Sequence, residues 1–375
     1  MTGILVLNSG SSSLKYRLFA PDLTVVTSGL ADHIGEPGSP VPDQEAALGQ
    51  MAAELDLAAL PLAGIGHRIV HGGGRFTGPC LVDDGVVAAI RDLIPLAPLH
   101  NPANLAGIEL ARRLRPDVPH IAVFDTAFHA TLPAAAATYA LDRTVARRHG
   151  IRRYGFHGTS YAYVSRRTAA LLGRPLADLN MIVLHLGNGA SAAAIEGGRS
   201  VETSMGMTPQ EGLVMGTRTG DIDPAIAVLL GRDAGMELAD IDALYTHRGG
   251  LRGLCGDNDM RVISRRADEG DPDARLALNV YCHRLRKYVG AYLAVLGRVD
   301  AVVFTAGVGE HSAPVRRQTL AGLAGLGIDV DADRNATGDG ERVISPPGTP
   351  VAVCVVPTDE ERAIAEEVAR CVGAL

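Results

Sequence analysis

Five polar positions stand where predicted buried strands end, and these positions are the best candidates for chemistry. They are Asn8, His71, Asp125, His185 and the turn at 307–310. In α/β proteins this edge of a sheet binds ligands, because backbone groups are free there and helix N-termini converge on it. One polar strand end is usually only a capped turn, but five of them favour a shared ligand cleft.

Three turns rich in serine or glycine could bind phosphate. They span residues 9–13, with Lys15 nearby, 187–191 and 307–312. Successive backbone N–H groups in such a turn can surround an anionic oxygen, although a serine-rich turn alone is more often a hairpin connection. The third turn matches a dinucleotide-binding fingerprint only in part, because Ser312 stands in place of the last glycine.

Two common nucleotide-binding signatures are missing from the sequence. Lys15 and Lys287 are the only lysines, and neither has glycine before it or serine or threonine after it, which excludes a Walker A loop. The glycine-rich loop, catalytic loop and Asp-Phe-Gly set of protein kinases is also absent. A phosphate-binding site in this chain would therefore use another kind of loop.

His67 and His71 have the i, i+4 spacing of a helical zinc pair, but the glycines at 64, 66 and 72–74 indicate a strand and a loop instead. Metal binding by this pair is therefore not expected. Asp125 and His157 could be structural hydrogen-bonding groups, and both also suit acid–base or charge-stabilising roles. The glycine-rich segment 212–224 reads as an ordered loop that presents Arg218.

A strand–turn–strand pattern occurs twice and predicts two related domains. Ile4–Leu7 and Leu14–Phe19 flank the first turn, and Ile182–Leu184 and Ala190–Ile195 flank the second. The repeat is short, so alone it is as compatible with chance as with duplication. Elsewhere, segments typical of helices and of buried strands alternate, which indicates an α/β protein.

The elements expected between these hairpins have recognisable boundaries. Helices are predicted at 44–60, 102–114, 161–172, 224–230, 238–245 and 272–296, and strands at 121–124, 301–304 and 351–356. Thr358 and Glu361 have the spacing of a capping box that opens a final helix. The inner stripe of that helix would be Ile364, Val368 and Val372.

Length and composition restrict the class of protein. With 375 residues, 47% of them hydrophobic, the chain is long enough for two domains. Its net charge of −7 argues against a broad nucleic-acid-binding surface, and no apolar run approaches the roughly 20 residues that span a bilayer. The first residues do not resemble a signal peptide, and the five scattered cysteines form neither a disulfide framework nor a zinc cluster. We therefore expect a cytoplasmic protein that binds neither nucleic acid nor a membrane.

Nine motifs, in this order along nearly the whole chain, closely resemble those of the acetate kinase (acetokinase) family. They lie at residues 8–16, 67–73, 99–102, 124–129, 154–160, 185–189, 215–218, 304–310 and 357–361. The resemblance implies the fold shared by acetate kinase, sugar kinases, Hsp70 and actin, in which two duplicated domains of the ribonuclease H-like type flank a nucleotide cleft. The domains would comprise residues 1–129 with 362–375, and residues 130–361.

The same resemblance implies an activity and the partners that it needs. The expected reaction is reversible phosphoryl transfer between Mg-ATP and acetate, which gives acetyl phosphate and ADP, usually in a homodimer. Mg²⁺ would be bound by Asn8 and Glu360, with Mn²⁺ as a substitute. Because acetate is already an anionic nucleophile, a general base should be unnecessary.

The resemblance also assigns roles to residues one by one. Arg68 and Arg218 would flank the carboxylate and the transferring phosphoryl group, His157 would donate to that group, and Asp125 would orient Arg68. His100 and His185 would support the phosphates, and Val70, Leu99, Phe156 and Pro209 would line the acyl pocket. The nucleotide would contact Ser11, Ser13, Lys15, His185, Gly187, Asn188, Gly189, Asp259, Met260, Arg261, Gly307, Val308 and Gly309.

The sequence departs from the family's motifs at two positions of the nucleotide site, and three other functions remain as alternatives. His311 stands where asparagine is expected and Met260 where some relatives have phenylalanine, which places the detail of the nucleotide site in question. A kinase for propionate or butyrate would share the mechanism, although Val70 favours acetate because a smaller residue there would leave room for propionate. A non-catalytic nucleotide sensor or Hsp70-like protein would bind ATP without forming acyl phosphate, and a simple acetate-binding module fits less well.

Overall fold

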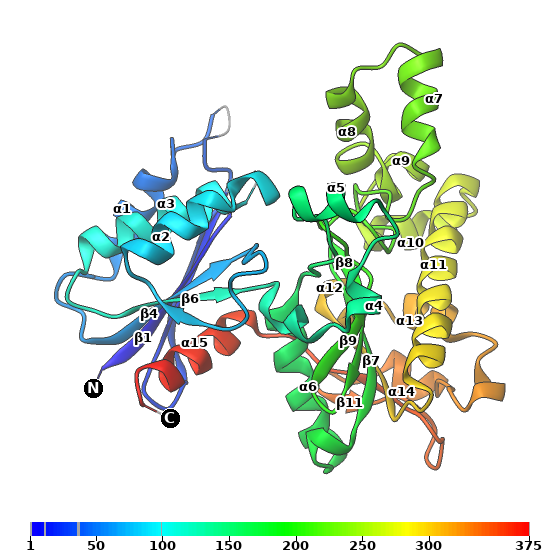
Figure 1. Ribbon diagram of the computed structural model, residues 1–375. Coiled ribbons are helices and arrows are strands. Elements are labelled where there is room, and N and C mark those ends of the chain that lie inside the picture. The colour runs from blue at the N-terminus through cyan, green and yellow to red at the C-terminus, as the bar shows by residue number, and fades with distance from the viewer. Residues whose placement is uncertain (1, 11–12, 36–37, 99, 375) are drawn as a thin grey trace. The chain divides into compact units, whose positions relative to one another are not determined.

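The computed structural model describes residues 2–10, 13–35, 38–98 and 100–374. The chain forms two compact units (Figure 1). The first comprises residues 1–130, 156–160 and 359–375, and the second comprises 131–155 and 161–358. Compared with the sequence-based boundaries, the first unit also includes the short segment 156–160, and its C-terminal part begins at 359 instead of 362.

A six-stranded sheet in the order β3-β2-β1-β4-β6-β5 forms the centre of the first unit. Its strands are β1 (Gly3–Ser9), β2 (Leu14–Phe19), β3 (Val25–Ala31), β4 (Leu62–Ile69), β5 (Cys80–Leu81) and β6 (His120–Phe124). β1, β4 and β6 are parallel, whereas β2, β3 and β5 pair in antiparallel fashion with their neighbours.

Alternating side chains of β1 separate two hydrophobic layers in the first unit. Leu5 and Leu7 pack with helices α1 (Gln44–Glu54) and α3 (Asn101–Leu114), while Ile4 and Val6 pack with helix α15 (Glu360–Cys371). Figure 1 shows α15, from the end of the chain, beside β1 and β4. The remaining helices of this unit are α2 (Asp84–Asp92) and the short 3₁₀ helices η1 (Ile94–Leu96) and η2 (Ala127–Thr131), of which η2 ends at the boundary with the second unit.

The sheet of the second unit repeats the topology of the first. Its order is β11-β12-β10-β7-β8-β9, with β7 (Asn180–Leu186), β8 (Ala190–Glu196), β9 (Arg199–Thr203), β10 (Ala301–Thr305), β11 (Arg342–Val343) and β12 (Ala352–Val355). β7, β10 and β12 are parallel, and β8, β9 and β11 are antiparallel to their neighbours. The predicted repeat of two hairpins is therefore a duplication of whole sheets.

The helices of the second unit lie, in sequence, before β7, between β9 and β10, and between β10 and β11. They are α4 (Ala134–Ala137), α5 (Arg143–Arg148), α6 (Gly158–Leu172, whose first three residues belong to the first unit), η3 (Leu176–Asp178), α7 (Ala225–Asp233), α8 (Leu238–Thr246), α9 (Gly250–Cys255), α10 (Met260–Asp268), α11 (Pro272–Leu296), α12 (Ala306–His311), α13 (Ala313–Leu320), η4 (Ala324–Leu326) and α14 (Ala332–Ala336).

Three local predictions were wrong. α1 ends at Glu54 and not at residue 60. The predicted turn at 307–310 lies inside the short helix α12. The N-cap of α15 is Asp359, whose side chain accepts a hydrogen bond from Arg362 N, so Thr358 and Glu361 do not form the expected capping box.

A buried pair of histidines should make the protein sensitive to mild acid. His120 Nε2 donates to the carbonyl of Arg115 (3.0 Å), so His120 Nδ1 accepts from His67 Nε2 (2.9 Å) and both rings are neutral. Burial lowers the pKa of His67, and the neighbouring His120 adds to the effect; burial likewise lowers the pKa of His120. The unfolded chain therefore binds more protons below about pH 6.5, and stability must fall as the pH drops through that value.

We expect about 1–2 kcal/mol to be lost between pH 7 and pH 5.5, measured as a shift of the urea midpoint. The variant His120→Gln removes one titrating ring and should lose less over the same interval. Equal pH dependence in the variant and the parent chain would contradict this explanation.

Candidate active site

Arg68 and Asp125 form a buried ion pair at the ends of two adjacent strands. Arg68 lies near the end of β4, Asp125 follows β6 directly, and the parallel pairing of these strands brings the two side chains together. Arg68 Nη2 donates to Asp125 Oδ2 (2.7 Å), and Nε lies 3.1–3.2 Å from both carboxylate oxygens. Burial alone would lower the pKa of Arg68. The attraction of the carboxylates of Asp125 and Glu360 is together stronger, so the pKa of Arg68 is raised.

Asp125 also fixes the turn that carries His157. Its carbonyl accepts from Gly158 N (2.9 Å), and its carboxylate accepts from Thr159 Oγ1 (3.2 Å). A side chain on Gly158 would overlap the carbonyl oxygen of Asp125, so only glycine fits there. His157 itself has a φ of +58°, a conformation that costs energy for a residue with a side chain and is concentrated at functional sites.

Four carboxylates and three cations form a connected cluster at the start of α15. Lys15 binds Glu361 (2.8 Å), Arg17 binds Asp359 through both carboxylate oxygens (2.8 and 2.9 Å), and Arg68 Nη1 lies 3.4 Å from Glu360. Asp125, which also binds Arg68, is the fourth carboxylate, so the carboxylates of the cluster outnumber its cations by one. Burial raises the pKa of Glu360, and this effect exceeds the opposing attraction of Arg68.

This excess charge fits the binding of a divalent cation. Glu360 could supply a carboxylate, and Asn8, which stands opposite Lys15 at the end of β1, could supply an amide oxygen. Mg²⁺ needs only one or two such protein ligands, because it keeps several waters and binds substrate phosphates. No group of three or more His, Cys, Asp or Glu side chains suited to a metal occurs within the described ranges, so the site would depend on those additional ligands.

The other predicted residues of the first unit lie around the same strand ends. Val70 N donates to Asn104 Oδ1 (3.0 Å), and Phe156 is buried with its ring edge-on to His71. His100 immediately precedes α3. The Ser13 carbonyl accepts from Gly10 N. Ser11 and Leu99, predicted in the nucleotide and acyl sites, lie outside the described residues.

In the second unit, Arg218 carries a charge that no carboxylate within the described ranges neutralises. Its Nη1 donates to the carbonyl of Pro209 (2.8 Å) and approaches Met215 Sδ (3.6 Å). Burial lowers the pKa of Arg218, which remains protonated because the ordinary pKa of a guanidinium is so high. A guanidinium in this setting is suited to bind an anion.

A cavity of about 560 Å³ in the second unit brings together most of the predicted nucleotide residues. Its wall includes Gly187, Asn188, Asp259, Met260, Arg261, Gly307 and Val308. Gly189 and Gly309 do not line it; the carbonyl of Gly309 instead accepts from the buried Arg316 (2.9 Å). His185 is buried in β7 next to the ring of Tyr161.

Several residues of this wall were missed by the sequence analysis, among them two that carry buried hydroxyl groups. Tyr281 in α11 and Ser264 in α10 have buried hydroxyl groups with no hydrogen-bond partner in the part of the chain that the structure describes. Both stand inside helices, where an apolar periodicity gives no sign of a ligand contact. His311 also lines the cavity, so the departure noted in the sequence lies at the cavity itself.

These features define a class of protein: a duplicated α/β fold with an acidic cluster suited to a divalent cation in one unit, and an arginine and a nucleotide-sized cavity in the other. Residues 3–366 match the model of the acetokinase family. The chain therefore belongs to the acetokinase family. None of the helices in the described ranges is long and apolar enough to cross a membrane.

Individual relatives agree with this assignment. The chain is 59% identical to an acetate kinase of Streptomyces coelicolor, with 98% of this chain and 96% of that protein covered. It is 55% identical to an acetate kinase of Clavibacter michiganensis, with 98% of each covered. Among solved structures, acetate kinase of Porphyromonas gingivalis superposes with a TM-score of 0.93 at 40% identity, with 99% of each chain covered. A propionate kinase of Francisella tularensis superposes with a TM-score of 0.92 at 38% identity, with 98% of this chain and 99% of that one covered.

Proposed function

We propose that this protein catalyses reversible, Mg²⁺-dependent phosphoryl transfer from ATP to acetate, giving acetyl phosphate and ADP. The observation that carries the proposal is the guanidinium of Arg218, which has no carboxylate partner within the described ranges and so has charge available for an anion. Membership of the acetokinase family and the acetate kinases among the relatives support the same reaction.

Bringing together two anions is the main physical problem of this reaction, and the arginines address it. Arg68, oriented by Asp125, and Arg218 would hold the acetate carboxylate and the equatorial oxygens of the transferring phosphoryl group. His157 would donate to those oxygens as charge moves in the transition state. The acetate oxygen attacks phosphorus as the bond to the ADP oxygen breaks, so transfer is direct and in line, and no proton has to be removed.

Nucleotide and metal binding complete the proposed site. Glu360 and Asn8 would hold Mg²⁺, or Mn²⁺ in its place, and the ion would neutralise phosphate charge. His100 and His185 would support the phosphates, and Ser11, Ser13 and Lys15 would contribute from the first strand–turn–strand unit. The wall of the 560 Å³ cavity would hold the nucleoside.

The acyl pocket would be formed by Val70, Leu99, Phe156 and Pro209. We expect Val70→Ala to improve kcat/KM for propionate relative to acetate by about tenfold, because room for one methylene is worth about 1–3 kcal/mol. Steady-state kinetics with both acids test this, with Val86→Ala on the surface helix α2 as the control. An unchanged ratio would remove Val70 from the pocket.

Hydroxylamine trapping of acyl phosphate tests the function itself. The protein is incubated with Mg-ATP and acetate, propionate or butyrate in parallel, and binding of ADP is measured by calorimetry on the same sample. Product that is strongest with acetate is the expected result. Preference for propionate would favour the alternative suggested by the propionate kinase relative, and ADP binding without any product would favour a nucleotide sensor.

We also propose that the protein is a homodimer, acts in the cytoplasm and binds neither nucleic acid nor a membrane. The helical hairpin α7–α8 supports dimerisation, because Val228, Leu229 and Leu238 expose half or more of their surface there (Figure 1). Such exposure of several apolar side chains is typical of an interface. Sedimentation equilibrium gives the mass, and a monomer at micromolar concentration would contradict the dimer.

A further inference from the structure

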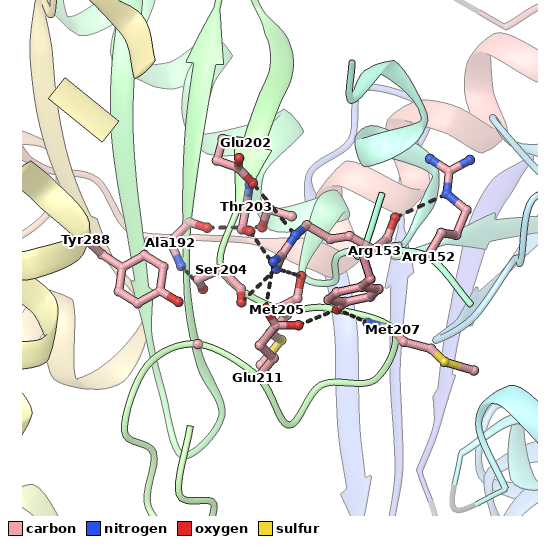
Figure 2. Close-up of polar contacts among 12 residues, drawn as sticks. Arg152, Arg153, Ala192, Glu202, Thr203, Ser204, Met205, Met207, Glu211 and Tyr288 are labelled. Atoms are coloured by element: carbon pink, nitrogen blue, oxygen red, sulfur yellow. Dashed lines mark hydrogen bonds and ion pairs between the residues drawn. The ribbon is translucent and has the colours of Figure 1, made fainter. Parts of the chain in front are cut away.

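Arg153 is the centre of a polar network that neither the predicted site nor the proposed mechanism uses (Figure 2). Its Nη1 donates to three successive backbone carbonyls, those of Thr203 (3.1 Å), Ser204 (3.2 Å) and Met205 (3.1 Å). Its Nη2 donates to Glu211 Oε1 (2.6 Å). One side chain therefore ties both ends of the loop that follows β9.

Tyr139 extends the network to the middle of the same loop. Its ring lies under the Arg153 guanidinium, 5.6 Å from Cζ to the ring centre, and its hydroxyl donates to Glu211 Oε2 and accepts from Met207 N (3.0 Å). A side chain on Gly206 would overlap both Glu211 and Tyr139, so the loop closes tightly over this pair.

The backbone next to Arg153 holds this loop as well. Tyr154 N and Gly155 N both donate to the carbonyl of Gly206, at 3.0 and 3.2 Å. On the far side, Gln210 donates to Thr219 Oγ1 (2.9 Å), next to Arg218 in the sequence. The loop 203–211 is thus fixed along its length, and Arg153 makes the largest number of these hydrogen bonds.

The position of Arg218 depends on this loop. Arg218 Nη1 donates to the carbonyl of Pro209 (2.8 Å), and Pro209 lies between Met207 and Glu211, the two residues that Tyr139 contacts. We propose that Arg153 is a positioning residue for Arg218, acting through Pro209. This inference rests on the proposed function only in taking Arg218 as the group that contacts the substrates.

A partly buried arginine is a costly way to provide stability alone. Arg153 and Glu211 are both partly withdrawn from water, and burying such a pair gains little over well-packed apolar residues. A planar guanidinium with several fixed N–H groups can, however, hold several acceptors at defined positions. Precise placement of the loop, and so of Arg218, is the use that these contacts support.

The test compares Arg153→Met with a matched control, Arg286→Met. Arg286 also donates to two successive carbonyls, those of Gln318 and Thr319, but these lie at the end of α13 and not in the loop 203–211. We expect Arg153→Met to lower kcat/KM for acetate by about 10²-fold, the loss typical of a misplaced catalytic group, and to leave ADP affinity unchanged. Arg286→Met should alter neither quantity, but it should lower Tm.

A double-mutant cycle separates positioning from general damage. If Arg153 acts through Arg218, replacing Arg153 in an Arg218→Ala background should cause almost no further loss. Equal losses in both backgrounds, normal kcat/KM in Arg153→Met, or a parallel loss of ADP affinity would overturn the proposal. If the parent chain binds ADP but forms no acyl phosphate, the proposed function fails instead.

Tyr139→Phe provides a test even if Arg153→Met does not fold. It keeps the ring under the guanidinium and removes only the hydroxyl that holds Met207 and Glu211. We expect a smaller effect of the same kind as in Arg153→Met: kcat/KM for acetate should fall by about tenfold, and ADP affinity should be unchanged. Unchanged kinetics in this variant would contradict the role of the network.

Discussion

Arg218→Ala should lower kcat for acetyl phosphate formation by about 10³-fold or more, while the protein stays folded and still binds ADP. An arginine that contacts a transferring phosphoryl group is worth about 10³–10⁵ in kcat. Within the described ranges, the hydrogen bonds of the side chain reach only Pro209 and Met215, so its removal breaks few polar contacts of the fold. Acyl phosphate trapping measures the rate, and calorimetry with ADP confirms the folded state.

Two further variants make this result specific. Arg218→Lys keeps the charge but not the planar fork, and we expect it to recover only a small part of the lost rate. Arg232→Ala removes an exposed arginine of the same unit that pairs with Asp233, and it should behave as the parent chain. Turnover near the parent value in folded Arg218→Ala would remove Arg218 from the mechanism.

Asp125→Ala should reduce both turnover and stability. The carboxylate of Asp125 is almost fully buried and accepts from Arg68 and Thr159, so its loss frees the arginine and removes one of the hydrogen bonds that hold the turn carrying His157; the bond from Gly158 N to the Asp125 carbonyl remains. We expect kcat to fall by at least about 10²-fold, because both groups would be misplaced. The free energy of unfolding should fall by about 3–5 kcal/mol, because Arg68 keeps its charge without its main partner.

Comparison with an exposed ion pair isolates the effect of burial. Glu109→Ala breaks the pair with Arg91 in the same unit, and its cost should be below about 1 kcal/mol, with normal turnover. Urea unfolding and acyl phosphate trapping are measured on both variants. Normal turnover in a destabilised Asp125→Ala protein would show that the carboxylate has only a structural role.

The sequence predicted those parts of the site that lie at the ends of regular elements. Asp125 follows a strand of five buried residues, and Arg68 lies in a motif that ends the neighbouring strand. The repeated strand–turn–strand pattern likewise predicted the two related domains, because the spacing of apolar residues in a strand can be recognised directly in the sequence. Contacts of this kind follow from strand order and register.

Arg153, Tyr139 and Glu211 could not be grouped from the sequence. They lie up to 72 residues apart and meet over an irregular loop, where no periodicity relates the side chains. Tyr281 was missed for a different reason: a tyrosine at a buried helical position looks like an ordinary core residue. The N-cap of α15 was displaced by one residue because Asp359 and Thr358 are both good caps, and Asp359 is also held by Arg17.

The return of α15 to the first sheet sets an order for assembly during synthesis. Ile4 and Val6 of β1 are synthesised long before their packing partners Ile364 and Val368. Apart from the short segment 156–160, the second unit is one continuous stretch and can form while the chain is still growing. The first unit must wait with one face of its sheet uncovered until α15 has been made. Its exposure to chaperones and to aggregation should therefore be set by the time needed to synthesise the residues between β1 and α15.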